Sequence, residues 1–270
     1  MPWVTSEFIW ADSYFVEIFD MLNRRWMTAG VFIVFVIAWA GISSGQMPPR
    51  EILTRADMAR GNLEGVKWLV NIASIENNNA QSRSLNVLAR GYDFLGIMIE
   101  PPKTKNQKII MIDHNMWYTK PGLKKPVPVS SRQKLIGGAA YGDIAATNYA
   151  DDYAPNPMPD ETINGELCYV FDLKAVSKKS TYDQIKYWVS KERVVGVKSE
   201  FYSVSGKLFK TAVFEYDNQI IIENKPTPFI SRMTITDALV ESNITTLIFN
   251  ENQLVRIPDS TFDMNVFSAQ

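Results

Sequence analysis

The 270-residue chain is 46% hydrophobic, which is sufficient for one domain with a sizeable core. Its formal net charge of −1 does not favour nucleic acid or another polyanion as a partner. The only cysteine, Cys168, excludes an internal disulfide, so burial alone must hold the fold together.

Residues 1–20 contain acids but no lysine or arginine, unlike the basic leading region of an export signal. We therefore predict that translation starts at Met21 and that residues 1–20 are a mis-assigned start. The alternative is a short cytoplasmic extension that forms an amphipathic helix, since its apolar residues fall near helical spacing at Phe8, Ile9, Phe15 and Phe19.

Residues 21–46 have the pattern of an export signal. Arg24 and Arg25 precede an apolar run at 29–40, and small polar residues follow it. This run is shorter than the roughly 18 to 20 residues that a stable membrane-spanning helix needs. We predict a signal peptide that sends the chain to the periplasm, with a retained membrane anchor as the alternative. An acylated lipoprotein is not expected, because Cys168 is far from the cleavage region.

Residues 47–270 are predicted to form one domain that begins with a helix. The segment from Arg50 to Arg60 places its apolar residues near one face, and Gly61 follows as a stop signal. The residues on that face are Ile52, Leu53, Ala56 and Ala59.

The segment 113–153 is predicted to contain a short aromatic strand and a flap. Met116, Trp117 and Tyr118 form the strand, and a hairpin rich in Pro, Gly and Lys follows. Residues 130–153 are then predicted to form a loosely helical flap that starts at a Ser-Ser pair. Its small residues could pack closely against a neighbour: Gly137, Gly138, Ala139, Ala140, Ala145 and Ala146.

Residues 114–142 contain no acid but several bases, which are Lys120, Lys124, Lys125, Arg132 and Lys134. Such a cluster is typical of a solvated hairpin loop. It is also compatible with contact to a phosphate or a lipid headgroup, for which Lys124 and Lys125 are the candidates.

Most of the chain after Gly65 is predicted to be β-strand. Apolar and polar residues alternate at 167–173, 185–189 and 208–216. Turn signals separate these strands at Asn164–Gly165, at 191–193 and at Ser205–Gly206. Repeated hairpins without long intervening helices favour one large antiparallel sheet.

The apolar face of such a sheet must be covered, and one helix with one flap leaves room for a cavity. An ordinary sandwich would show the same alternation. The candidates for lining the cavity could also be core residues; they are Met116, Trp117, Tyr118, Tyr187 and Phe201. Methionine suits a surface that adapts to varied ligands, and Met98, Met111 and Met233 also lie in predicted strands.

The span 51–267 resembles the outer membrane lipoprotein-sorting family of LolA-like proteins. It is most similar to an uncharacterised branch often encoded near resistance-nodulation-division (RND) exporters. The resemblance is carried by the segments EILTRADMARG, DHNMWYTKPGLKKPVPVSSRQKLIGGAAYGDIAATNYADDY, INGELCYVFDLKA, TYDQIKYWVSKERVVGVKSEFYSVSGKLFKTAVFEY and RMTITDAL.

The resemblance implies a mainly β (α+β) fold, an incomplete antiparallel β-barrel with covering helices and an apolar cavity. It implies a periplasmic carrier of the acyl chains of lipids or lipoproteins. The implied partners are an RND-type exporter or an inner-membrane transporter and an outer-membrane acceptor. In the family an arginine holds the lid shut, and Arg132 is the candidate for this role. The alternative is a lipid-sensing regulatory or protein-binding module of the periplasm.

Catalysis is not expected from this sequence, and neither a cofactor nor a metal is implied. His114 is the only histidine, and it lies in an Asp-His-Asn stretch that is typical of a hairpin tip. One His and one Cys do not make a metal cluster. The adjacent acids at 151–152 and 160–161 are typical of solvated loops.

Overall fold

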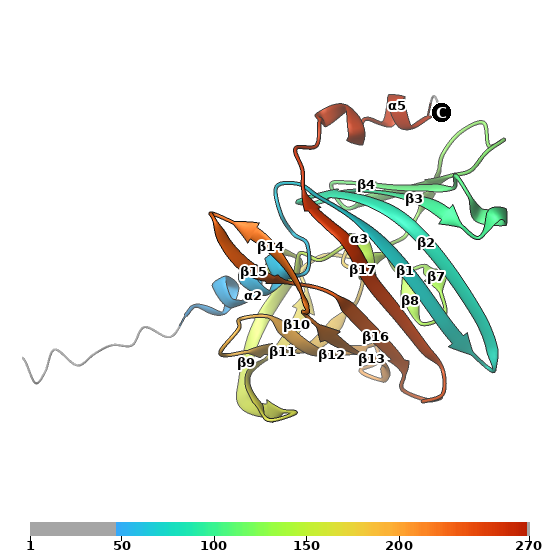
Figure 1. Cartoon of the computed structure of the whole chain (residues 1–270). Helices are drawn as coiled ribbons and strands as arrows, with labels where there is room; N and C mark the ends of the chain where they lie inside the picture. Colours follow the sequence, from blue (N-terminus) through green and yellow to red (C-terminus); the bar gives the residue numbers. More distant parts are fainter. Residues whose placement is uncertain (1–46, 269–270) are drawn as a thin grey trace, which may run out of the picture. The chain divides into compact units, whose positions relative to one another are not determined.

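Thirteen antiparallel strands form one curved sheet in the computed structural model, which describes residues 47–268 (Figure 1). The strand order is β6-β5-β4-β3-β2-β1-β17-β16-β13-β12-β11-β10-β9, so the first and last strands of the domain pair near the middle. Strands β6 and β9 are the two ends of the sheet, which does not close into a barrel. The fold class predicted from the sequence is therefore confirmed. The predictions for residues 1–20 and 21–46 lie outside the described residues.

The first half of the sheet consists of β1 (Val66–Glu76), β2 (Asn79–Arg90), β3 (Asp93–Glu100), β4 (Lys108–Ile112), β5 (Asn115–Thr119) and β6 (Val127–Val129). The second half consists of β9 (Tyr153–Ile163), β10 (Glu166–Ala175), β11 (Gln184–Ser190), β12 (Gly196–Tyr202), β13 (Leu208–Glu215), β16 (Arg232–Asp237) and β17 (Ile244–Leu254). Two separate hairpins are β7 (Lys134–Ile136) with β8 (Ala139–Ala140), and β14 (Asn218–Ile222) with β15 (Lys225–Phe229).

Helices are few and short. They are α2 (Pro49–Ala59), α3 (Gly142–Ala145), α4 (Tyr149–Asp152) and α5 (Met264–Ser268), with 3-10 turns η1 (Pro102–Thr104) and η2 (Asp259–Phe262). Within residues 47–268, no helix is long and apolar enough to cross a bilayer. The predicted helix at 50–60 is confirmed, and its apolar face is buried as expected at Ile52, Leu53, Ala56 and Ala59.

Tight turns at the predicted places join the strands of the second half. Asn164 and Gly165 both have positive φ between β9 and β10, as a two-residue hairpin turn requires. Gly206 has positive φ between β12 and β13. The longest hairpin, β1–β2, turns through Asn77 and Asn78, which also have positive φ.

The free edge of β9 is protected by its composition. Pro155, Pro157 and Pro159 occupy alternate positions of this strand, which pairs only with β10. Proline has no N–H to offer to another strand, so these residues prevent the edge from pairing with a second chain. The opposite edge strand, β6, also has a proline at its centre, Pro128.

One face of the sheet forms the main hydrophobic core, and we call it the inner face. The core includes α2 at one end and side chains from most of the long strands. Trp68 of β1, for example, packs against Phe229 of β15 and Phe249 of β17, with ring centroids 5.9 and 6.2 Å apart. The last turn of α2 contributes a fully buried acid, Asp57, whose Oδ2 accepts a 2.8 Å hydrogen bond from the Ala150 N–H of α4.

Burial raises the pKa of Asp57 from 3.8 to about 8. Between these two pH values the folded chain holds a proton that the unfolded chain has lost, so the stability contributed by this residue falls as pH rises.

We expect Asp57→Asn, which stays neutral and keeps the acceptor oxygen, to be more stable than the wild type at neutral pH. The advantage should grow from about pH 4 to about pH 8 and stay constant above that range. Urea unfolding of both proteins across this pH range measures it. A difference that does not change with pH would contradict the assignment.

Candidate functional site

Residues 130–153, which we call the flap, pack against the inner face of the sheet. The flap contains the β7–β8 hairpin and the short helices α3 and α4, so it is only partly helical. Its apolar side chains join the main core, among them Leu135, Ile136, Ile144 and Tyr149. The flap therefore covers apolar surface that the other helices leave open.

Small residues let the flap approach the sheet closely. A β-carbon on Gly137 would lie 1.8 Å from Ser74 Oγ of β1, and Gly137 also has positive φ. A β-carbon on Gly142 would lie 2.0 Å from Thr181 Oγ1. The prediction that small residues of this segment pack closely is confirmed, because larger side chains at these positions would force the flap away.

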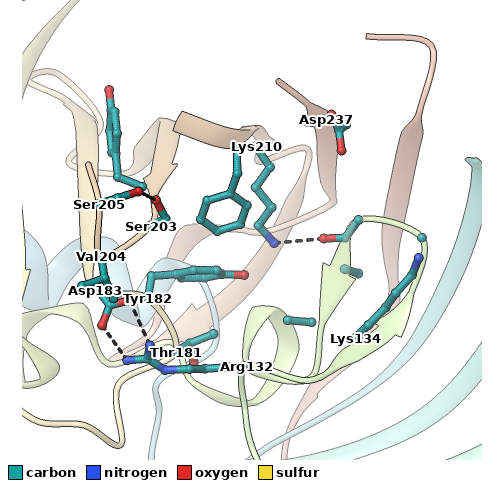
Figure 2. A pocket seen from close by; sticks show the side chains of 16 residues that line it. Arg132, Lys134, Thr181, Tyr182, Asp183, Ser203, Val204, Ser205, Lys210 and Asp237 are labelled. Carbon is teal, nitrogen blue, oxygen red and sulfur yellow. Dashed lines mark hydrogen bonds and ion pairs between the residues drawn. The ribbon is translucent and has the colours of Figure 1, made fainter. Parts of the chain in front are cut away.

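A buried ion pair joins the flap to the sheet, and Figure 2 shows Lys210, its basic member, beside the flap. Lys210 Nζ of β13 lies 2.7 Å from Asp143 Oδ2 of α3, and the two side chains are 5% and 1% exposed. Lys210 also donates to the Gly138 carbonyl at 3.0 Å. Asp143 accepts two more hydrogen bonds, from the Tyr182 hydroxyl at 2.6 Å and from the Ala140 N–H at 2.7 Å. Burial lowers the pKa of Lys210, and the Asp143 carboxylate opposes this shift.

Charged contacts also hold the two ends of the flap. At its start, Arg132 makes a bidentate pair with Asp183 at 2.9 and 3.0 Å and donates to the Ser180 carbonyl at 3.0 Å. At its end, Asp152 lies 2.7 Å from His114 Nε2. Burial raises the pKa of Asp152, and the His114 contact opposes this shift. His114 thus lies at the β4–β5 turn, as predicted, and it also contacts Asp152 of the flap.

A groove of about 590 Å³ opens beside the Lys210–Asp143 pair (Figure 2). This volume lies in the range of small-molecule sites. The flap hairpin forms one wall, and the ends of β12 and β13 with the segment before β11 form the other. Its lining residues are Arg132, Lys134, Gly137, Gly138, Ala139, Ala140, Thr181, Tyr182, Asp183, Tyr202, Ser203, Val204, Ser205, Phe209, Lys210 and Asp237.

A β-bulge shapes the wall of this groove. Phe201 pairs with Lys210 and Tyr202 pairs with Leu208, so Phe209 is an extra residue in β13. Because of this bulge, the adjacent Phe209 and Lys210 both approach the Tyr182 ring, at 6.0 Å between ring centroids and 4.8 Å from Nζ. The groove thus has an aromatic wall with a charged group beside it.

The residues predicted to line a cavity are divided between the two faces of the sheet. Met116, Tyr187 and Phe201 are buried in the main core, and Tyr118 packs against it. Trp117 has the opposite parity in β5 and is half-buried, so it lies on the other face. Three further methionines, Met98, Met111 and Met233, are buried in the core on strands, as expected. None of these residues lines the groove.

The basic candidates also occupy different places. Lys124 and Lys125 are exposed in the turn between β5 and β6 and do not line the groove. Arg132 does line it, but from the flap, and its contacts lie in the segment before β11.

Several site residues escaped the sequence analysis, namely Asp143, Tyr182, Phe209 and Lys210. One signal was available for Lys210, because it shares its parity in β13 with Ala212 and Phe214, which are buried. A lysine on the apolar parity of a strand indicates a buried ionic partner. The partner, Asp143, lies 67 positions from Lys210 in the chain, so the pattern of residues around Lys210 does not identify it.

The described residues offer no metal centre. Across residues 47–268 no three His, Cys, Asp or Glu side chains are placed to hold a metal ion. Cys168 is buried, and burial raises its pKa, which keeps the thiol protonated.

Comparison with known proteins found one family model and several solved structures that match this chain. A family model described as "Uncharacterized protein" matches residues 92–268. A crystal structure of a LolA superfamily protein from Nitrosomonas europaea is 30% identical and has a TM-score of 0.73. That similarity covers 81% of this chain and 98% of the other. No curated protein matches the chain. The chain therefore belongs to the LolA superfamily.

Two further solved structures have the same fold. A putative outer membrane lipoprotein-sorting protein domain from Vibrio parahaemolyticus is 20% identical, with a TM-score of 0.69 and coverage of 81% of this chain and 97% of the other. A DUF1329 family protein from Desulfovibrio piger is 17% identical, with a TM-score of 0.66 and coverage of 79% and 95%. At these identities the likeness concerns the fold alone.

We expect Lys210→Met to destabilise the fold by about 3–5 kcal/mol, because it leaves the Asp143 carboxylate buried without its cation. Adding Asp143→Asn to this variant should recover part of the loss, since the amide is neutral. Chemical denaturation measures both effects.

Lys134→Met is the matched control, because Lys134 belongs to the same flap but forms an exposed ion pair with Glu76. This change should cost less than about 1 kcal/mol. Equal losses in Lys210→Met and Lys134→Met would show that the buried pair does not hold the flap.

Proposed function

We propose that this chain is a periplasmic carrier that binds the acyl chains of lipids or lipoproteins on the inner face of its sheet. The observation that carries the proposal is the flap, a separate element that covers apolar sheet surface and borders an aromatic groove. The LolA superfamily membership supports it, as does the fold shared with a protein described as a lipoprotein-sorting domain.

The physics of lipid transfer explains why a movable cover suits this task. Moving one CH₂ group into water costs about 0.8 kcal/mol, so a long acyl chain costs roughly 10 kcal/mol to extract unless protein replaces the membrane. Tyr187 and Phe201 are both 0% exposed, so an acyl chain reaches them only after the flap has moved. The groove is the place where a chain first meets apolar side chains while the flap is closed.

The residues of this chain would then act in sequence. Phe209 and Tyr182 receive the acyl chain in the groove, and the flap moves as the Lys210–Asp143 pair separates. Met116, Tyr118, Tyr187 and Phe201 become the walls around the chain, and Arg132 closes the flap again through Asp183. This proposal contains no chemical step.

The donor and acceptor belong to the same proposal. An RND-type exporter or an inner-membrane transporter would supply the lipid, and an outer-membrane acceptor would receive it. Pull-down with the periplasmic loops of an exporter tests this part. Capture of a membrane-bound signalling protein instead would favour the lipid-sensing alternative.

We expect Phe209→Ala to weaken binding of a fluorescent fatty acid by on the order of tenfold, because truncation removes one of the aromatic side chains that line the groove. Val213→Ala on the same strand is the control, since Val213 is 43% exposed and does not line the groove. Fluorescence titration of the whole chain measures both. Unchanged binding in Phe209→Ala would remove the groove from the acyl-chain path.

A further inference from the structure

Arg60 is a cation buried inside the domain. It follows the last residue of α2, and only 2% of its surface is exposed. Its guanidinium carbon lies 4.5 Å from the centre of the Tyr149 ring and 4.8 Å from that of Phe214. Tyr149 belongs to α4 of the flap and Phe214 to β13, so Arg60 lies between the cover and the sheet.

The guanidinium is not satisfied by its surroundings. Nε and Nη1 of Arg60 are buried and have no hydrogen-bond partner, and among the described residues Arg60 forms no ion pair within 4.0 Å. The neighbouring acid, Asp57, does not neutralise it at pH 7, because burial raises the pKa of Asp57 to about 8. The Tyr149 and Phe214 rings attract the charge through their faces, and the Tyr149 side chain also hydrogen-bonds to Arg60, but Nε and Nη1 remain without a partner.

Two further donors lie close to this guanidinium. The hydroxyls of Tyr187 and Tyr216 are buried and also lack a hydrogen-bond partner, and both interact electrostatically with Arg60. Gly196 provides the space for one of them, since a β-carbon there would lie 1.8 Å from the Tyr187 hydroxyl. The cluster thus combines unpaired N–H and O–H donors around one positive charge.

This donor set matches an oxyanion. A guanidinium presents its N–H groups as a planar fork that fits the two oxygens of a carboxylate or a phosphate, and hydroxyls complete such a site. A buried cation without a partner is strongly unfavourable, and a bound anion removes that penalty.

We propose that Arg60, with the hydroxyls of Tyr187 and Tyr216, binds a carboxylate or phosphate oxyanion beneath the flap. The inference rests on the proposed function where the anion is the headgroup of a carried lipid. Tyr187 connects the two parts of the ligand, because its ring belongs to the inner-face core while its hydroxyl belongs to the Arg60 cluster. Movement of α4 takes Tyr149 off the guanidinium and admits the anion.

The test compares ligands that share a 16-carbon chain and differ in the head. The whole wild-type chain and its Arg60→Met variant are titrated with palmitate, with hexadecanol, with hexadecyl phosphate and with inorganic phosphate. We expect the wild type to bind an anionic ligand at least about tenfold more tightly than hexadecanol. Arg60→Met should lose this preference while its affinity for hexadecanol changes less than about twofold.

Thermal melting of Arg60→Met and ligand binding by two more variants distinguish a lost anion site from a misfolded protein. Arg60→Met should melt at the same or a higher temperature than the ligand-free wild type, because it removes an unpaired buried charge. Arg60→Lys keeps the charge without the fork and should retain a reduced preference for the anion. Tyr216→Phe removes one hydroxyl and should weaken anion binding several-fold without changing hexadecanol binding.

Each outcome decides between sources of the anion or against the site. Arg60-dependent binding of palmitate identifies a lipid carboxylate, and Arg60-dependent binding of hexadecyl phosphate identifies a lipid phosphate. Arg60-dependent binding of inorganic phosphate alone identifies a free ion and leaves the carrier proposal without support. Equal affinity for palmitate, hexadecyl phosphate and hexadecanol overturns the anion site but keeps the carrier. Failure of every ligand overturns both.

Discussion

The apolar inner face of the sheet must be covered, and the rest of the domain depends on this constraint. The sheet is open at both ends, and the helices of the domain are too short to cover the whole face. Curvature brings the two halves of the sheet around this face, but β6 and β9 remain free edges (Figure 1). The helix α2 covers only one end of it. A segment in the middle of the chain must supply the remaining cover, and its glycines let it lie against β1 and the segment before β11.

The flap is held in place by two kinds of contact. Its apolar side chains join the core, and polar contacts also hold it at separate points. These are ion pairs or close charged contacts through Lys210, Arg132 and His114, and a hydrogen bond to buried Asp57. Buried ion pairs add little net stability compared with well-packed apolar groups, because desolvation offsets much of their attraction. They do require one specific position of the flap. These contacts therefore fix where the cover lies, and the proposed carrier function requires in addition that it separates from the sheet when a ligand enters or leaves.

Much of the fold was predictable from the sequence because its signals are local. The helix at α2, the turns at Asn164–Gly165 and Ser205–Gly206, and the alternation in β10, β11 and β13 each depend on residues close in the chain. Segments spread over most of residues 51–267 also carried the family resemblance, which the structural comparison confirms.

The site was less predictable because its contacts join distant segments. Alternation shows that Trp117 and Tyr118 point to opposite faces, but only strand pairing shows which face is the inner one. The partners of Lys210 and His114 lie in the flap, and no spacing rule connects them. Arg60 lies at the end of a helix, where an exposed basic residue is ordinary, and only the packing of Tyr149 above it reveals its burial.

The proposed carrier function requires that the flap covers a surface that binds acyl chains. Native mass spectrometry of the whole chain, purified from a bacterial envelope without detergent and followed by organic extraction, tests this claim most directly. The account predicts a complex with about one lipid per protein molecule, from which extraction releases acyl-chain-containing lipid. A ligand-free mass that does not change when lipid is added would contradict it, and the inner face would then be an ordinary packed core.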